Sequence, residues 1–170
     1  MADTFAADKR TDEKEKEQLM QLVGFTIGNE HFGVDILMVQ EIIRSAPITS
    51  VPNSPEFIEG VINLRGNIIP VIELRKRLNL FREETSTKES WILILEINSR
   101  VTGFIVDSVT RVLKILESTI EPPPEVVVAG LANQYIRGVC DIGEGLLIML
   151  DFNSILLADE LKLLKAIEGE

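Results

Sequence analysis

Short apolar runs, many of them alternating with polar positions and rich in Ile and Val, fill the chain between residues 18 and 152. β-Branched residues and a period of two favour strands. Turn-forming pairs such as Gly28-Asn29, Gly66-Asn67 and Asn98-Ser99 separate the runs. The pattern predicts strands at Leu22–Ile27, His31–Val34, Val61–Arg65, Ile68–Ile72, Trp91–Ile97, Val101–Val106, Tyr135–Ile142 and Leu146–Leu150.

Helical spacing is confined to short segments and to the two ends of the chain. Short helical pieces are expected at Ile36–Ile43 and Leu74–Leu78. Residues 153–170 place leucines near helical spacing and predict an amphipathic C-terminal helix. Residues 1–17 mix acidic and basic side chains, with Met1 and Phe5 as their large apolar residues, and predict an acidic, flexible tail.

Two segments of the chain repeat one another. When 57–74 is shifted by 78 residues onto 135–152, all ten apolar positions of the first segment stay apolar. When 22–51 is shifted by 70 residues, Gly33 falls on Gly103 and Val39 falls on Val109. The sequence therefore indicates two copies of one β-rich module, with chance similarity between β-rich patterns as the alternative.

A small module of strands is most simply a barrel, because closure removes exposed sheet edges. We expect a first barrel subdomain at 18–85 and a second at 86–152, with the C-terminal helix at 153–170. Together they form an all-β protein with short helices.

The hairpin Val61–Ile72 carries an unusual polar pattern. A two-residue turn at Gly66-Asn67 pairs Arg65 with Ile68 and gives one face that is wholly apolar. The opposite face mixes Asn63 and Arg65 with apolar side chains, and the second copy lacks this polar pair. An arginine beside exposed apolar groups suits a protein-binding surface, although an internal ion pair with Glu41 or Glu73 is equally compatible with the sequence.

Charge argues against two classes of partner. The chain has 170 residues, a formal net charge of −10 and few aromatic residues, whereas nucleic-acid-binding proteins oppose positive charge to phosphate. We expect neither nucleic acid nor an anionic membrane surface as a partner. No apolar run reaches the roughly 18 residues of a membrane-spanning helix, and the N-terminus lacks a signal-peptide pattern, so a cytoplasmic protein is expected.

Reactive residues are scarce. The chain has one histidine, His31, and one cysteine, Cys140, so a Cys/His-rich zinc site or an internal disulfide is not expected. We predict no catalytic residue, cofactor or metal. Two alternative classes remain. A carboxylate-based hydrolase is disfavoured because no catalytic constellation is apparent, and a nucleic-acid-binding barrel is disfavoured by the acidic net charge.

Three blocks of the sequence resemble the CheW-like domain family. The first is Gly-Val-Ile-Asn-Leu-Arg-Gly at 60–66, followed by Pro70-Val71-Ile72. The second runs from Phe32 to Ile42 and includes Val-Gln-Glu-Ile at 39–42, and the third is Ile-Val-Asp-Ser-Val at 105–109. The resemblance covers residues from about Gln18 to the C-terminus.

This resemblance implies a fold and a function. The family fold is two intertwined, SH3-like, five-stranded β-barrels. Its members are non-catalytic chemotaxis adaptors that couple methyl-accepting chemoreceptors to the histidine kinase CheA in signalling arrays. The receptor's cytoplasmic tip docks in a groove between the barrels, and the regulatory domain of CheA packs on a second surface. The alternative within the family is a scaffold of a non-flagellar receptor–kinase pathway.

The resemblance also assigns residues by position. Receptor contacts are expected from Ile36, Val39, Glu41, Asn63 and Arg65, and Glu41 and Arg65 are expected to pair across the groove. Kinase contacts are expected in the stretch 45–49, from Ala46 and Ile48. A contact that closes rings in arrays is expected at Glu121 and Val126, where the family favours a basic residue and an aromatic one.

Overall fold

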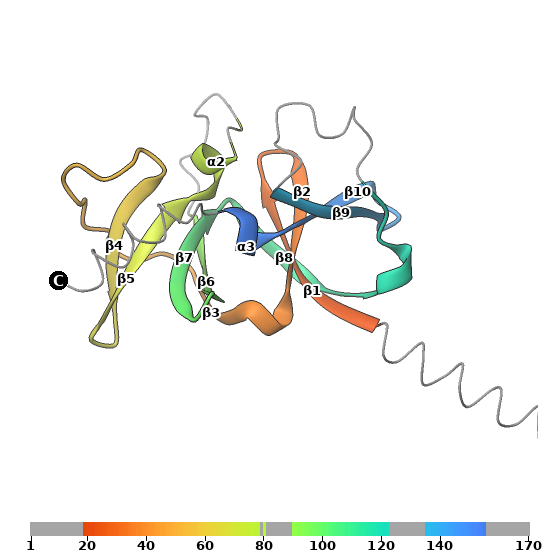
Figure 1. Ribbon diagram of the computed structural model, residues 1–170, viewed down its shortest axis with the longest axis horizontal. Coiled ribbons are helices and arrows are strands. Elements are labelled where there is room, and N and C mark those ends of the chain that lie inside the picture. The colour runs from red at the N-terminus through yellow and green to blue at the C-terminus, as the bar shows by residue number, and fades with distance from the viewer. Residues whose placement is uncertain (1–18, 79, 81–89, 123–134, 156–170) are drawn as a thin grey trace, which may run out of the picture.

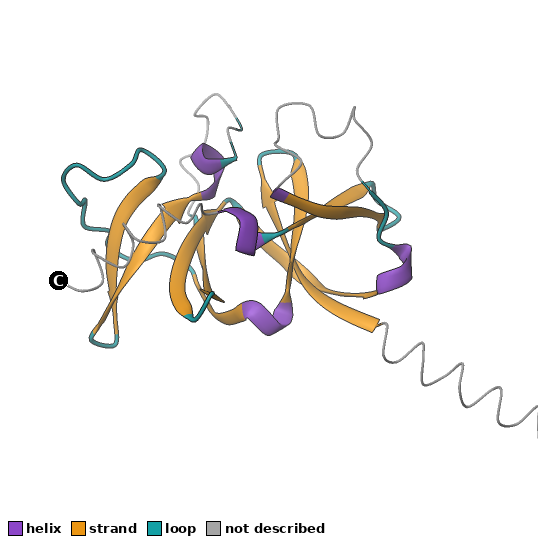
Figure 2. Cartoon of the chain, viewed as in Figure 1, coloured by secondary structure: helices purple, strands orange, loops and turns teal. Residues whose placement is uncertain are grey.

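Ten strands make up most of the computed structural model, which describes residues 19–78, 80, 90–122 and 135–155 (Figure 2). The first five strands are β1 (Leu19–Ile27), β2 (Glu30–Asp35), β3 (Val39–Ile43), β4 (Ile58–Leu64) and β5 (Asn67–Glu73). The second five are β6 (Trp91–Ile97), β7 (Arg100–Val106), β8 (Ser108–Leu116), β9 (Ile136–Asp141) and β10 (Leu146–Leu150). Helical turns are η1 (Ile36–Met38), α2 (Leu74–Arg77), η2 (Glu117–Thr119) and α3 (Phe152–Ile155).

The strands form two five-stranded sheets that exchange strands between the halves of the chain (Figure 1). One sheet has the order β8-β1-β2-β10-β9 and is called barrel 1 below; the other has the order β3-β6-β7-β5-β4 and is called barrel 2. The N-terminal hairpin β1–β2 therefore lies with strands from the second half. This confirms the all-β, intertwined architecture. The subdomain bounds 18–85 and 86–152 stay a prediction.

The internal repeat appears in the strand pairing. Replacing β1–β5 by β6–β10, and the reverse, converts the order of one sheet into that of the other. The parallel pairing is equivalent in both barrels: Met149 pairs with Gly33 in barrel 1, and Val71 pairs with Gly103 in barrel 2. The two modules therefore share the same strand order and the same register of parallel pairing, as well as a similar sequence pattern.

In each copy, a short segment after the third strand, here called the strap, closes the barrel. The strap contains Thr49 in barrel 2 and Glu121 in barrel 1. The backbone of Thr49 pairs with Val61 of β4 at 2.8 and 2.9 Å, and Glu121 pairs with Val139 of β9 at 2.8 Å in both directions. These bridges join the outer strands of each sheet and satisfy their edge groups. The close approach requires glycine at the neighbouring position: a Cβ on Gly60 would lie 2.1 Å from the Thr49 carbonyl oxygen.

Three apolar clusters hold the molecule together. The largest lies between the sheets and includes Phe25 and Phe32 from barrel 1 and Phe104 from barrel 2, with Phe152 against Phe104 at a ring distance of 5.0 Å. Each barrel also has a small cluster of its own. The members of the barrel 1 cluster, Leu22, Cys140, Leu147 and Met149, repeat Ile92, Ile62, Ile69 and Val71 of barrel 2.

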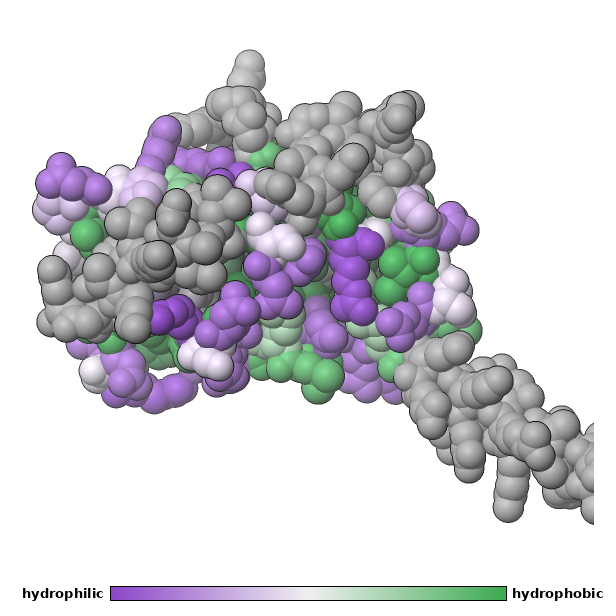
Figure 3. All heavy atoms as spheres, viewed as in Figure 1, coloured by the Kyte–Doolittle hydropathy of each residue, from purple (hydrophilic) through white to green (hydrophobic). Residues whose placement is uncertain are grey.

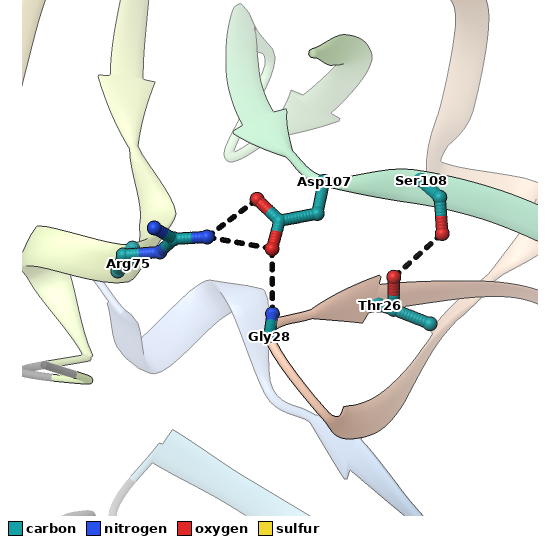
Figure 4. Close-up of polar contacts among 5 residues, drawn as sticks. All are labelled: Thr26, Gly28, Arg75, Asp107 and Ser108. Carbon is teal, nitrogen blue, oxygen red and sulfur yellow. Dashed lines mark hydrogen bonds and ion pairs between the residues drawn. The ribbon is translucent and has the colours of Figure 1, made fainter. Parts of the chain in front are cut away.

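Polar contacts also join the barrels (Figure 4). Arg75 of α2 donates from Nη2 to both carboxylate oxygens of Asp107 at 2.6 Å, and Asp107 Oδ2 accepts from the Gly28 N–H at 2.6 Å. Asp107 lies between β7 and β8, where the chain crosses from barrel 2 to barrel 1, and Gly28 lies in the β1–β2 turn. Thr26 and Ser108 share a hydrogen bond beside this contact. We call Arg75, Asp107 and Gly28 the inter-barrel clasp.

One predicted helix is wrong, and two strands, β3 and β8, were not predicted. The helix expected at Ile36–Ile43 is one helical turn, η1, followed by strand β3. Each strand contains a bulge, between Val39 and Glu41 in β3 and between Val109 and Val112 in β8, which breaks the period of two. The helical turn expected near Leu74 is present. Residues 1–17 and most of 153–170 lie outside the described residues.

The turn of the β4–β5 hairpin is also corrected. Leu64 pairs with Asn67, so the turn is Arg65-Gly66 rather than Gly66-Asn67. Both turn residues have positive φ, 53° and 88°, which is the geometry of a type I′ turn. The faces of the hairpin are as predicted, with Ile62, Ile69 and Val71 buried. Arg65, however, lies at the tip of the hairpin instead of within a strand.

Candidate functional site

An exposed ion pair joins β3 to the tip of the β4–β5 hairpin. Arg65 donates from Nη1 to Glu41 Oε2 at 2.9 Å and from Nη2 to Glu41 Oε1 at 2.7 Å. The Arg65 side chain is 73% exposed, whereas that of Glu41 is 28% exposed. The paired geometry fixes the guanidinium plane and leaves its outer edge to solvent. This arrangement combines the two interpretations of Arg65, because the residue is both ion-paired and available to a partner.

Local structure explains how these side chains meet. The bulge at Gln40 lets Val39 pair with Leu95 and pack on the shared core, while Glu41 pairs with Ile94 and faces the rim of barrel 2. Asn63 Oδ1 accepts from the Gly66 N–H at 2.9 Å and so stabilises the turn that carries Arg65. The structure therefore brings Glu41, Asn63 and Arg65 together.

An open cavity of about 630 Å³ lies beside this pair. Its floor is aliphatic and its rim is polar, a combination typical of protein-binding sites. Ile68, which the sequence analysis did not select, is 43% exposed there. The lining residues are Gln40, Glu41, Leu64, Arg65, Gly66, Asn67, Ile68, Ile69, Ile94, Ser99, Arg100 and Val101.

Ile36 and Val39 lie outside this cavity. Ile36 is in η1, and both side chains are half-buried against the shared core. Between them Leu37 is 89% exposed, and apolar side chains gather in the region of η1 at the lower edge of the molecule in Figure 3. Leu37 is thus a candidate apolar anchor that the sequence analysis missed, although it is adjacent to Ile36 in the same sequence block.

The predicted kinase-contact residues lie on the strap that closes barrel 2. Ala46 is half-buried against the small core of that barrel, and Ile48 is 37% exposed and packs over Gly60. The backbone pairing of Thr49 with Val61 holds this strap in place. Ile48 is therefore an aliphatic side chain presented from a fixed backbone.

Of the two predicted array-contact residues, Glu121 lies on the equivalent strap of barrel 1. Glu121 is exposed, and its backbone pairs with Val139 as that of Thr49 pairs with Val61. Val126 lies outside the described residues. The predicted kinase contacts and Glu121 thus fall on straps that are copies of one another.

Burial perturbs two titratable groups. Burial raises the pKa of Glu73 to about 7, helped by the nearby carboxylate of Glu59, and the N–H and charge of Arg75 oppose the rise only partly. Burial raises the pKa of the Cys140 thiol, which favours the protonated and less nucleophilic form. Among the described residues no group of three or more His, Cys, Asp or Glu is placed to hold a metal ion. In the same part of the chain, no helix is long and apolar enough to cross a membrane.

Fold and site together define a protein-interaction module of two linked barrels, and the comparisons with known proteins agree. The family model of the CheW-like domain matches residues 21–160. The chain is 41% identical over 140 residues to chemotaxis protein CheW of Klebsiella aerogenes, covering 82% of each chain. It is 33% identical over 149 residues to chemotaxis protein CheW of Treponema pallidum, covering 86% of this chain and 87% of the relative.

A solved structure gives the same result. The crystal structure of scaffolding protein TtCheW from Thermoanaerobacter tengcongensis matches with a TM-score of 0.74 and 37% identity, over 83% of this chain and 90% of that one. The chain therefore belongs to the CheW-like domain family. Its function is that of a chemotaxis coupling adaptor.

Proposed function

We propose that this chain couples methyl-accepting chemoreceptors to the histidine kinase CheA through two separate surfaces. The receptor's cytoplasmic tip binds the surface around Arg65, and the regulatory domain of CheA binds the strap that carries Ala46 and Ile48. The proposal rests chiefly on the exposed Glu41–Arg65 ion pair, which lies beside an open cavity with an aliphatic floor.

The receptor surface suits a helical segment. A helix docks by placing aliphatic anchors in an apolar groove while polar groups at the rim fix its register. Ile68 supplies exposed aliphatic area, and Arg65 offers donors that Glu41 holds in one orientation. Arginine is frequent among residues that dominate binding energy, since it combines apolar area with several hydrogen bonds.

The kinase surface is separate from the receptor surface. Ile48 lies on the strap between β3 and β4, whereas Arg65 lies at the tip of the β4–β5 hairpin. An aliphatic side chain held on a fixed backbone loses little conformational entropy on binding. One chain can then hold both partners at once, as coupling requires.

The adaptor role also bears on catalysis and location. We propose that the chain acts without catalysis, cofactor or metal, because coupling needs two binding surfaces rather than chemistry. It acts in the cytoplasm and is recruited to membrane-bound receptor arrays by its partners. Ring closure through Glu121 and Val126 then requires a partner whose charges complement Glu121.

Two substitutions test the separation of the surfaces. Arg65→Ala should lower affinity for a receptor-tip fragment by about tenfold or more and leave CheA affinity unchanged. Ile48→Asp should do the reverse, because a carboxylate would be placed in an apolar contact. Calorimetric titration of each variant with both partners measures these affinities, and circular dichroism checks that the variants are folded.

Lys76→Ala provides a matched control. Lys76 of α2 pairs with Glu59 of β4 at 2.7 Å in an exposed ion pair that belongs to neither proposed surface, so its loss should change neither affinity. Equal affinities of Arg65→Ala and the unaltered chain for the receptor tip would refute the assignment of the receptor surface.

A further inference from the structure

A second open cavity, of about 360 Å³, lies beside the inter-barrel clasp. Five charged side chains line it: Glu59 of β4, Glu73 at the end of β5, Arg75 and Lys76 of α2, and Asp107 of the crossover from β7 to β8. None of them belongs to the surfaces proposed for the receptor and the kinase. The cavity is therefore a separate polar feature, and it contains both charged members of the clasp, Arg75 and Asp107.

The acidic and basic groups of this cavity are unequal in number. Two of its three carboxylates already have a cation: Lys76 Nζ lies 2.7 Å from Glu59 Oε1, and Arg75 Nη2 lies 2.6 Å from both carboxylate oxygens of Asp107. Within the part of the chain that the structure describes, Glu73 has no ion-pair partner. Glu73 is therefore the surplus acid of the cavity.

Arg75 has the complementary deficit. Its Nη2 serves both oxygens of Asp107, whereas its Nε is buried without an acceptor. A buried donor without an acceptor is costly, so the guanidinium gains from any carboxylate that reaches Nε. Glu73 lies two residues before Arg75 and lines the same cavity. An ionised Glu73 is thus placed to compete with Asp107 for the guanidinium.

Burial brings the ionisation of Glu73 close to neutral pH. Burial and the nearby carboxylate of Glu59 raise the pKa of Glu73 to about 7, and Arg75 and Lys76 of α2 oppose the rise only partly. From β7, the residue paired with Glu73 is Ile105, which carries no charge. The Glu73 side chain is therefore neutral on the acidic side of about pH 7 and charged on the alkaline side.

We propose that ionisation of Glu73 opens the inter-barrel clasp. While Glu73 is neutral, Arg75 binds Asp107 in the geometry of Figure 4. When Glu73 is charged, Arg75 turns its Nε towards Glu73, and its contact with Asp107 weakens because two carboxylates then share one guanidinium. Asp107 then holds only the Gly28 N–H, and α2 of barrel 2 is released from the β1–β2 turn of barrel 1.

The polar contact between the barrels then depends on pH. The clasp is closed below about pH 7 and loosens above it, which is also the direction in which a carboxyl group with a raised pKa destabilises a fold. The proposal does not rest on the proposed function, because it concerns this chain alone and no residue of the two binding surfaces.

Nuclear magnetic resonance of the ¹⁵N-labelled full chain tests the proposal. As the pH rises from about 5.5 to about 8.5, the resonances of the Arg75 Nε–H and the Gly28 N–H should shift with one midpoint at about pH 7. Glu73→Gln keeps the neutral form and should abolish both shifts. Glu59→Gln should lower the midpoint by about 0.5 or more on the pH scale, because it removes a like charge.

Two control variants separate Glu73 from other groups. Histidine also titrates in this range, so His31→Gln should leave both shifts in place. Glu117→Gln removes an exposed carboxylate just after β8, whose Leu116 pairs with Leu19 at the opposite end of β1 from Gly28, and should not move the midpoint. Resonances that stay constant across the range, or that still shift in Glu73→Gln, would overturn the proposal.

An energetic measurement tests the competition for Arg75 directly. Asp107→Asn keeps an acceptor for the Gly28 N–H but removes the charge that holds Arg75. It should lower the free energy of unfolding more at about pH 6 than at about pH 8, because the clasp is closed at the lower pH. In the Glu73→Gln background the loss should be the same at both pH values. Equal losses at the two pH values in the otherwise unaltered chain would overturn the proposal as well.

Discussion

Gly60 and Gly138 are the residues at which each barrel closes. A Cβ on Gly60 would overlap the Thr49 carbonyl at 2.1 Å, and one on Gly138 would lie 2.4 Å from Ile120 Cγ2 and 3.0 Å from the Glu121 oxygen. The strap backbone at Thr49 and Glu121 cannot move away from the added atom without breaking the hydrogen bonds that join the strap to the barrel. These glycines therefore set the position of the straps, and with them Ala46, Ile48 and Glu121, the predicted contact residues that the structure describes there.

Gly60→Ala should lower the free energy of unfolding by about 3 kcal/mol or more, because the methyl group clashes with backbone and φ is +155°. Urea denaturation measures the loss. Gly66→Ala is the matched control: its φ is also positive, but no atom lies within 4 Å of the added Cβ, so a loss of about 1–2 kcal/mol is expected. Equal losses in the two variants would contradict the role of the strap contact.

Glu73 gives the stability a dependence on pH. Its folded pKa of about 7 lies above the ordinary value of 4.5, so the folded state binds the proton more tightly. The stabilisation that comes from the tighter binding of this proton in the folded state is complete below about pH 4.5. It is lost as the pH rises through about 7. The free energy of unfolding contributed by this group therefore falls with rising pH across that window.

Glu73→Gln should remove this dependence. The variant should be more stable than the unaltered chain at about pH 8, by about 1–2 kcal/mol after allowance for solvent screening, and the difference should shrink at about pH 5. Thermal denaturation at the two pH values measures the change. A constant difference between the proteins at both pH values would show that Glu73 does not titrate in this window.

The inter-barrel clasp links elements of barrel 2 to elements of barrel 1 through polar contacts. Arg75 is held by α2, Asp107 by the crossover from β7 to β8, and Gly28 by the β1–β2 turn. Arg75 Nε is buried without a partner, so the guanidinium depends on Asp107 for compensation. The third sequence block of the family resemblance contains Asp107, which the sequence analysis did not connect to any role.

Asp107→Ala should lower the free energy of unfolding by about 1–3 kcal/mol, because it leaves Arg75 and the Gly28 N–H unsatisfied. Arg137→Ala removes an exposed ion pair with Glu117 and should cost at most about 1 kcal/mol. Chemical denaturation compares the two variants. If Asp107→Ala proved no more costly than Arg137→Ala, the clasp would not be a structural link.

Strand prediction succeeded where a short apolar run is bounded by turn residues. Trp91–Ile97 and Leu146–Leu150 have the predicted bounds, since their neighbours are turn residues. β3 was predicted as a helix because Ile36, Val39 and Ile43 have helical spacing, which arises from one helical turn and a bulge. Bulges depend on the partner strand, so local periodicity does not reveal them.

For the site, the sequence was sufficient to select Glu41 and Arg65 but not to place them. The family resemblance indicated their pairing, whereas the tip position of Arg65 depends on the type I′ turn. Leu37 and Ile68 were missed because exposure of an apolar residue is a property of the tertiary fold.

At the scale of the whole molecule, the chain forms two intertwined barrels around a shared core. Barrel 1 takes β1 and β2 from the first half of the chain and β8–β10 from the second, and barrel 2 takes its strands likewise from both. The largest core lies between the sheets and contains side chains from both. The repeat was visible in the residue pattern, whereas the intertwining of the barrels came from the family resemblance alone, because pairing between distant strands leaves no local pattern.

A fragment of residues 18–85 should therefore be unfolded as a monomer. It contains β3, β4 and β5 but lacks β6 and β7, which lie between β3 and β5 in barrel 2. Circular dichroism and NMR at low concentration test this expectation, with the full chain as the control. Dispersed amide resonances and cooperative unfolding of the monomeric fragment would show that each half folds alone.

The central claim is that the adaptor engages receptors through the surface around Arg65. The most direct measurement is CheA kinase activity in an assembly reconstituted from receptor, CheA and this chain. Arg65→Ala should abolish most of the receptor-dependent activation, while the variant keeps its fold and its affinity for CheA, because an exposed ion pair contributes little to stability. Full activation by Arg65→Ala at the same concentrations would contradict the claim.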